Sequence, residues 1–184
     1  MRVKYMLDES VMMSEKMAGY HVPVSIDYKD NDAIFHADNE LYYIKWVNHV
    51  SSLLMLTINS LTEKIIGVST VLINERATIT EDVVVRLDVP RVIGNVVIDM
   101  DSVYPNKPRT DTTEFTVALG EKSIYILKTL DSVTTRVVMG DMDVVLDSDN
   151  NVSGFIFSNF TDYEWNEIVE GIDDIVKRGM KKPE

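Results

Sequence analysis

Short runs in which apolar and polar residues alternate dominate this chain. The clearest runs are residues 41–47, 51–59 and 65–74, and turn-forming residues 60–64 separate the last two. Alternation with a period of two places every second side chain on the same face of a β-strand. The pattern therefore predicts antiparallel hairpins in this part of the chain.

Further strands are expected on both sides of these hairpins. They comprise residues 2–7, 22–28, 33–37, 82–88, 92–100, 114–119 and the alternating runs within 123–157. Several of these runs are rich in β-branched residues, which strands favour. Gly94 and Asn95 interrupt the run 92–100 and predict a bulge or a break there. Turns are expected at residues 29–32, 38–39 and 120–122.

Two segments are expected to depart from the β pattern. Residues 8–18 predict a short helix, because Asp8 can cap its start and Gly19 can end it. Residues 101–113 contain two prolines and no periodicity, so they predict a long loop or a seam between two halves of the chain.

The C-terminal segment carries the strongest helix signal. Thr161 and Glu164 form a capping box, and Phe160 can pack across the first turn as a hydrophobic staple. Apolar residues then recur every three or four positions and predict one apolar stripe, formed by Trp165, Ile168, Val169, Ile172, Ile175 and Val176. The expected helix spans residues 161–178, and Gly171 costs it about 1 kcal/mol relative to alanine.

Residues 147–151, with the sequence DSDNN, predict the tip of a hairpin. Their short polar side chains bond their own backbone and tolerate positive φ. The first, third and fifth residues also have the spacing of the first three calcium ligands in an EF-hand loop. That loop would need a glycine in place of Val152 and a bidentate glutamate in place of Ser158. We therefore expect no metal here, and no cofactor elsewhere.

Part of the strand pattern occurs twice. Residues 125–135 match residues 42–52 at a Tyr, a Lys and a Val with a constant offset of 83, and residues 146–155 resemble residues 58–68 at an offset of 87 or 88. A duplicated hairpin unit would explain both matches. Alternating β sequences with polar turns also resemble one another through composition alone, so both explanations stay open.

The length and composition limit the organisation of the protein. A chain of 184 residues can bury a substantial core, and we expect one domain, 1–184, with 1–100 and 114–184 as candidate halves. The absence of cysteine excludes disulfides and thiolate metal sites. No apolar run reaches the ~20 residues of a membrane span, and none near the N-terminus has signal-peptide length. We therefore expect a cytoplasmic protein with no membrane partner.

The net charge of −12 is concentrated near the C-terminus. Ten of the 30 acidic residues lie between Asp141 and Asp174, where there is no Lys or Arg. Such a field disfavours nucleic acid and favours a cationic protein partner, although a solvated face that maintains solubility is the simpler alternative. The candidate partner-binding residues are Asp141, Asp143, Asp147, Asp149, Asp162, Glu164, Glu167, Glu170 and Asp174.

No sequence signature indicates an enzyme. The chain lacks the G-x-S-x-G, P-loop, G-x-G-x-x-G and H-E-x-x-H motifs. Its three histidines are not spaced as a ligand pair. A pair of carboxylates for acid and base catalysis is available, as it would be in any acidic β protein. We therefore expect a protein that is not an enzyme.

The repeated pattern, which begins with a Tyr and a Lys and is followed by a capped acidic helix, resembles small bacterial immunity proteins. These belong to polymorphic-toxin and contact-dependent growth-inhibition systems, and the resemblance covers residues 41–71 and 123–176. It implies a cytoplasmic protein that binds a cognate toxin domain, often a basic nuclease, and blocks its active site or substrate groove. It assigns no individual residue a role. Acidic side chains opposite a phosphate-binding groove would mimic the charge of the substrate.

Together these features predict an α+β domain, mainly antiparallel β in two related hairpin-rich halves, with one C-terminal amphipathic helix packed on the sheet. The leading functional hypothesis is a toxin-neutralising immunity protein. Two other classes stay open: a structural or assembly subunit of a phage or secretion machine, and a β module that binds a carbohydrate or another small ligand. The oligomeric state is not predicted.

Overall fold

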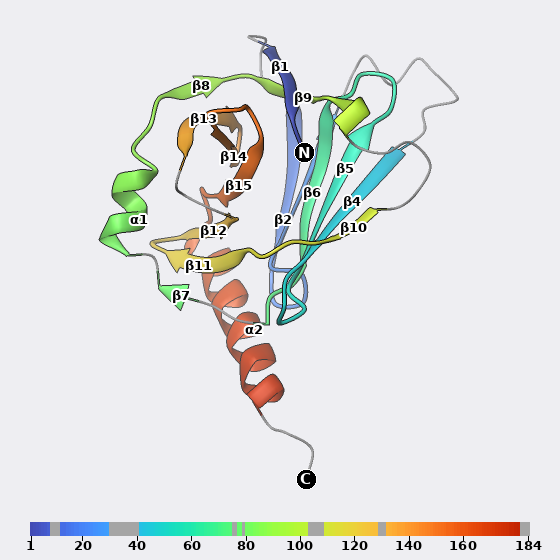
Figure 1. The fold of residues 1–184 in the computed structure, drawn as a ribbon. Coiled ribbons are helices and arrows are strands. Elements are labelled where there is room, and N and C mark those ends of the chain that lie inside the picture. Colours follow the sequence, from blue (N-terminus) through green and yellow to red (C-terminus); the bar gives the residue numbers. More distant parts are fainter. Residues whose placement is uncertain are drawn as a thin grey trace.

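Two β-sheets pack against each other, and a long C-terminal helix lies across one end of the core between them (Figure 1). The computed structural model describes residues 1–7, 12–29, 41–74, 77–78, 80–102, 109–128 and 132–180. The expected fold class, an α+β domain that is mainly antiparallel β, is confirmed.

Among the described residues, the first sheet has six strands, which are antiparallel except for the parallel pair β10 and β4. In spatial order they are β10 (Arg109–Thr112), β4 (Leu41–Val47), β5 (Leu53–Asn59), β6 (Ile65–Leu72), β3 (Val24–Lys29) and β2 (Met13–Ala18). The hairpin predicted from residues 51–74 is therefore confirmed as β5 and β6.

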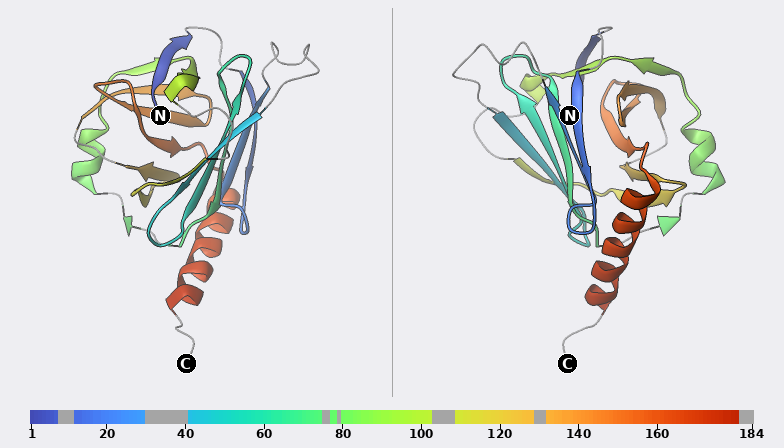
Figure 2. Two further views of the ribbon diagram at one scale, coloured as in Figure 1. Left: turned by 45° about the vertical axis from the view of Figure 1, so that its right-hand side comes forward. Right: turned by 180° about the vertical axis from the view of Figure 1, so that it is seen from behind.

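The second sheet has seven strands in the part of the chain that the structure describes, and it curls strongly (Figure 2). In spatial order they are β7 (Ala77–Thr78), β11 (Thr116–Gly120), β12 (Ser123–Leu127), β15 (Val152–Phe157), β14 (Met142–Asp147), β13 (Val133–Met139) and β8 (Arg91–Ile93). Its short edge strands, β7 and β8, pair parallel to their neighbours, and the other pairs are antiparallel.

A two-stranded ribbon of β1 (Val3–Leu7) and β9 (Asn95–Ile98) connects the tips of two hairpins, one from each sheet. The N–H of Val3 donates to the carbonyl of Asn150 over 2.8 Å, and the N–H of Ile98 donates to the carbonyl of Glu63 over 2.8 Å. Asn150 and Glu63 both have positive φ, at 59° and 57°. The ribbon thus continues the hydrogen bonding from one sheet to the other.

The two tips that look related in sequence are built alike. At the β5–β6 tip the N–H of Asn59 donates to the carbonyl of Lys64 over 3.1 Å, and at the β14–β15 tip the N–H of Asp147 donates to that of Asn151 over 3.0 Å. In both tips the side-chain Oδ1 of the first residue accepts the backbone N–H two residues later. The offset of 87 to 88 therefore corresponds to a shared local structure.

The other half of the sequence match has no such counterpart. Strand β4 lies between β10 and β5, whereas β12 lies between β11 and β15. The segments 42–52 and 125–135 thus occupy different places in their sheets. The sheets also do not divide at residues 101–113, because β7 and β8 precede that segment and still belong to the second sheet.

Helix α2 (Asp162–Met180) confirms the predicted C-terminal helix and its cap. The N–H of Thr161 donates to Oε2 of Glu164 over 2.7 Å, and the N–H of Glu164 donates to Oγ1 of Thr161 over 3.2 Å. The Phe160 ring stacks on Trp165 with centroids 5.9 Å apart. Ile168 and other stripe residues join the core that both sheets share, so the apolar stripe faces inward.

Two elements were expected with the wrong secondary structure. In the segment expected to be helical, 8–18, residues Met13–Ala18 form strand β2, and residues 8–11 lie outside the described residues. In the segment expected to be a strand, 82–88, helix α1 (Glu81–Arg86) forms instead. The side chain of Thr80 caps α1 by accepting the N–H of Val83. This cap favours the helix against the strand preference of its valines, and α1 buries none of its own residues.

The expected loop 101–113 is wrong at its end, where β10 pairs with β4. A short 3-10 helix, Met100–Ser102, precedes it, and residues 103–108 lie outside the described residues. The break expected at Gly94 is confirmed, since β8 ends before it and β9 begins after it. The strand expected at 33–37 and the turn at 38–39 also lie outside the described residues.

Candidate functional site

The nine acidic candidates lie at three places: the turn before β14 and β14 itself, the β14–β15 tip, and helix α2 with its cap. They differ in how far their carboxylates are already engaged within the molecule. Each group is therefore assessed by its burial and its partners.

Asp143 lies inside the protein. Its side chain is 3% exposed, and its Oδ2 accepts a hydrogen bond from Nε of Arg136 over 2.9 Å, with Nη2 of the same residue also in contact. Arg91 approaches the same oxygen at 3.5 Å. Because a buried carboxylate needs such compensation, Asp143 has a structural role and is not available to a partner.

Asp141 and Glu164 share a cation from the first sheet. The Nζ of Lys16 on β2 lies 3.9 Å from Asp141 and 3.7 Å from Glu164, donates to the carbonyl of Asn159 over 2.7 Å and sits over the Phe160 ring. The backbone N–H of the helix cap, above all, holds the pKa of Glu164 below its usual range. Lys16 thus joins β2 to the start of α2.

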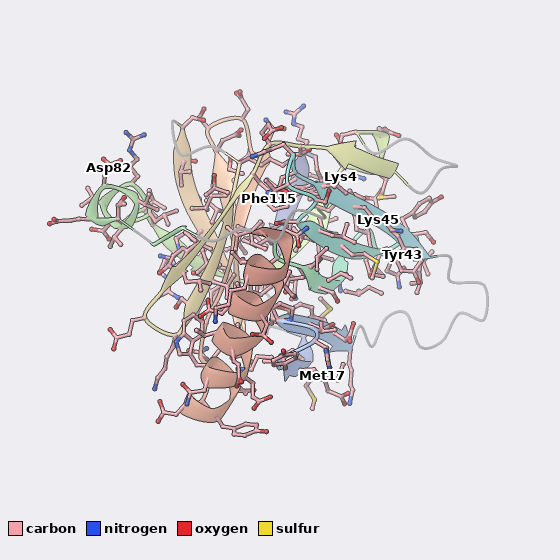
Figure 3. The ribbon with its side chains drawn as sticks, turned by 90° about the horizontal axis from the view of Figure 1, so that it is seen from below. Lys4, Met17, Tyr43, Lys45, Asp82 and Phe115 are labelled. Carbon is pink, nitrogen blue, oxygen red and sulfur yellow. The ribbon has the colours of Figure 1, made fainter. Side chains whose placement is uncertain are left out.

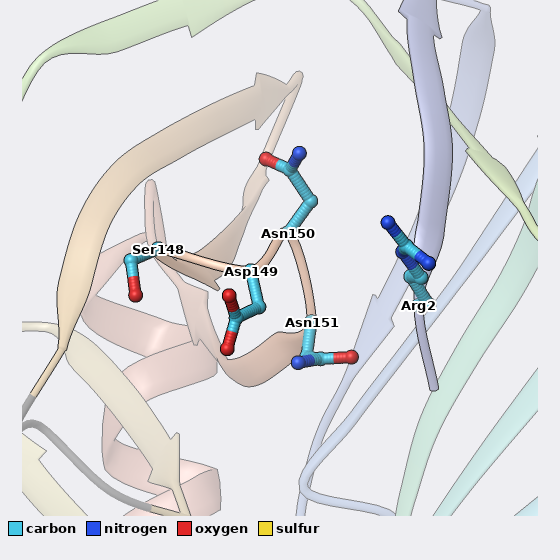
Figure 4. Close-up of a pocket in the computed structure, with 5 residues that line it drawn as sticks. All are labelled: Arg2, Ser148, Asp149, Asn150 and Asn151. Atoms are coloured by element: carbon cyan, nitrogen blue, oxygen red, sulfur yellow. The ribbon is translucent and has the colours of Figure 1, made fainter.

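Asp147 and Asp149 belong to the hairpin tip. Oδ1 of Asp147 accepts the N–H groups of Asp149 and Asn151 over 2.9 and 2.8 Å, so its carboxylate organises the turn. Asp149 lies exposed beside an open hollow of about 390 Å³ that Arg2 also lines (Figure 4). The lining side chains are all polar, and the hollow has no apolar wall that would enclose a ligand.

The remaining candidates lie on α2. Asp162 pairs with Lys122 over 2.6 Å, and this hydrogen bond holds the pKa of Asp162 below its usual range. The hydroxyl of Tyr20 donates to Asp174 over 2.5 Å. Within the described part of the chain, Glu167 and Glu170 form no hydrogen bond or ion pair through their carboxylates.

These two glutamates are three positions apart, so they lie on the same face of the helix. Glu170 is exposed and Glu167 is half-buried. Their carboxylates stand in a stretch with no Lys or Arg. Among the described residues, they and the Asp149 carboxylate at the hairpin tip are the members of the predicted acidic site without an ion pair or a side-chain hydrogen bond.

Sequence reasoning missed an exposed apolar set on the first sheet. Met13 and Met17 on β2 are 73% and 65% exposed, and Tyr43 on β4 is 42% exposed. Figure 3 shows Met17 and Tyr43 on the side of the sheet that faces away from the second sheet. The expected helix over 8–18 concealed this signal, because only a strand places Met13 and Met17 on one face with period two.

No group of three or more His, Cys, Asp or Glu side chains among the described residues could hold a metal ion. None of the helices among these residues has the length and apolarity needed to cross a bilayer. Comparisons with protein-family models and with curated protein sequences give no significant match to this chain.

Proposed function

We propose that this is a non-enzymatic binding protein that holds a cationic protein on the outer side of α2. We further propose that it is an immunity protein, which neutralises a basic toxin domain in the cytoplasm. The observation that carries the proposal is that Glu167 and Glu170 have no partner among the described residues, whereas most of the neighbouring carboxylates are paired within the fold.

The proposed mechanism is electrostatic. Two carboxylates at one-turn spacing resemble successive phosphates in charge, and a basic groove that binds a polyanion would attract them. The acidic field of α2 would accelerate the encounter at low ionic strength, and salt would screen it. Occupation of the groove then excludes the substrate without any chemical step by this protein.

The test is a capture experiment from lysate of the source organism, read by mass spectrometry at low and at high salt. The baits are the wild type, Glu167→Lys with Glu170→Lys, and a control pair, Asp88→Lys with Asp101→Lys. Asp88 and Asp101 are exposed and lie outside α2. Each double variant replaces two acidic residues by lysines, so both change the net charge equally.

We expect the wild type and the control to retain one basic protein at low salt, and the α2 variant to lose it. Circular dichroism checks that all three baits are folded. Retention of the same protein by the α2 variant would contradict the proposed surface. Recovery of no basic protein by any bait would contradict the proposed partner class.

A further inference from the structure

No described helix or strand covers the outer face of the first sheet. On β4 and β5 every second residue, such as Ile44 and Leu56, is buried in the core, whereas the residues between them, such as Lys45 and Met55, are only half-buried. Helices α1 and α2 both lie away from this outer face (Figure 3). We call the outward side chains of β4, β5, β6, β3 and β2 the outer sheet face.

Strand register aligns the outer sheet face in rows across the sheet. One row contains Tyr43, Thr57, Gly67, Asp27 and Glu15. The next row contains Lys45, Met55, Ser69, Ser25 and Met17. Small side chains prevail in the centre, on β6 and β3, and larger ones stand on the outer strands, so the centre allows a flat surface to approach closely.

Two opposite charges lie unpaired on this face. Within the described residues, neither Lys45 on β4 nor Asp27 on β3 forms an ion pair, although Glu15 nearby pairs with Lys29 over 2.5 Å. Strands β5 and β6 separate Lys45 from Asp27, and the two residues stand in adjacent rows, so their backbones are about 16 Å apart at the usual strand and residue spacings. The two charges therefore cannot pair within one molecule.

We infer that a second copy of this chain docks on the outer sheet face through a two-fold axis. The axis lies in the plane of the face, passes between β5 and β6, and is inclined by about 25° to the strands, because Lys45 and Asp27 stand in adjacent rows. Lys45 of each copy then meets Asp27 of the other, and the exposed Met17 of each copy covers apolar surface near β4. The inference is independent of the proposed function, because α2 stays outside this interface.

The size of the face sets the strength of the association. Five strands at ~4.8 Å spacing and about five residues at ~3.3 Å give a footprint on the order of 400 Å² per copy. A standard stable interface buries about 800 Å² per partner. The interface is therefore about half the standard size, so the dimer is a weak, reversible one, and two complementary ion pairs fix its register.

The test is analytical ultracentrifugation from low to several hundred micromolar protein. We compare the wild type with Lys45→Glu, Asp27→Lys, the double variant in one chain, and Asp88→Lys as an exposed control. We expect a concentration-dependent dimer for the wild type and the control, and at least tenfold weaker association for each single variant. Thermal melts check that every variant is folded.

The two-fold geometry also predicts how a mixture of the two single variants behaves. An equimolar mixture of the Lys45→Glu and Asp27→Lys chains should form a heterodimer, since both of its contacts then join opposite charges, and the double variant should dimerise alone. A monomeric wild type, single variants that dimerise normally, or a mixture that stays monomeric would each overturn the inference. A monomeric wild type would leave the face to a different protein.

Discussion

A substitution at Gly171 tests the close contact between α2 and the backbone just after the end of β2. A Cβ added at Gly171 would lie 2.1 Å from the carbonyl oxygen of Tyr20 and 2.9 Å from its carbonyl carbon. The side chain of Tyr20, which lies two residues after β2, also donates to Asp174, so Tyr20 contacts α2 through both its backbone and its hydroxyl. Gly171→Ala must therefore push α2 away from the backbone of Tyr20.

One stabilising and two destabilising contributions set the change in unfolding free energy. Alanine favours the helical state by about 1 kcal/mol, and overpacking of this kind costs about 1–3 kcal/mol. Loss of the hydrogen bond to a charged Asp174 adds up to about 2 kcal/mol. We expect a net destabilisation of about 1–3 kcal/mol, which corresponds to a melting temperature lower by about 3–10 °C for a chain of this size.

Denaturant and thermal unfolding of Gly171→Ala measure this effect directly. Gly19→Ala is the matched control, because a Cβ there meets nothing within 4 Å, and it should be neutral or slightly stabilising. A Gly171→Ala protein as stable as the wild type, or more stable, would refute the close contact with Tyr20. Helix propensity alone, which favours alanine over glycine, would then explain the result.

Three further predictions concern the acidic residues and the helix cap. Asp143→Ala should cost about 3–5 kcal/mol in unfolding free energy because it leaves Arg136 uncompensated, whereas Asp149→Ala should change it by less than about 0.5 kcal/mol. Thr161→Ala should cost about 1 kcal/mol and lower the helix signal in circular dichroism. The pKa of Glu164 is lower in the folded state, so its contribution is present above its ordinary pKa of about 4.3 and is lost as the pH falls through the lowered value. The difference in unfolding free energy between wild type and Glu164→Gln should therefore shrink from pH 7 to pH 3, and a constant difference would contradict this.

Local signals in the sequence predicted the hairpins and α2 well. The capping box and the DSDNN tip work through contacts within a few residues, so the sequence contains most of what determines them. The sequence similarity between the two hairpin tips corresponds to a similar local structure. The similarity between β4 and β12 does not correspond to equivalent positions in the two sheets, because the neighbours of a strand depend on distant segments.

The errors arose where distant pairing decides the structure. The segment Met13–Ala18 has a composition that suits a helix, and only its ladder with β3 makes it a strand. Strand β10 owes its existence to β4, more than 60 residues earlier in the chain. Local propensity carries no information on such partners.

The acidic site could be predicted only in part. Charge density located α2 correctly as an acidic element, but it did not separate Asp143, which is buried against Arg136, from Glu170, which is exposed. The hairpin turn at Gly140 brings Arg136 and Asp143 together across β13 and β14. Lys16 was harder to assign, since it reaches Glu164 from a strand that had been expected to be a helix.

The most direct test of the proposed function is a neutralisation assay with the basic protein that the wild type captures. That protein is expressed in a heterologous host alone, with the wild type, with the Glu167→Lys and Glu170→Lys variant, and with the Asp88→Lys and Asp101→Lys control. We predict growth arrest when it is expressed alone, rescue by the wild type and the control, and no rescue by the α2 variant. Growth without arrest, or equal rescue by the α2 variant, would contradict the claim that α2 neutralises a toxin.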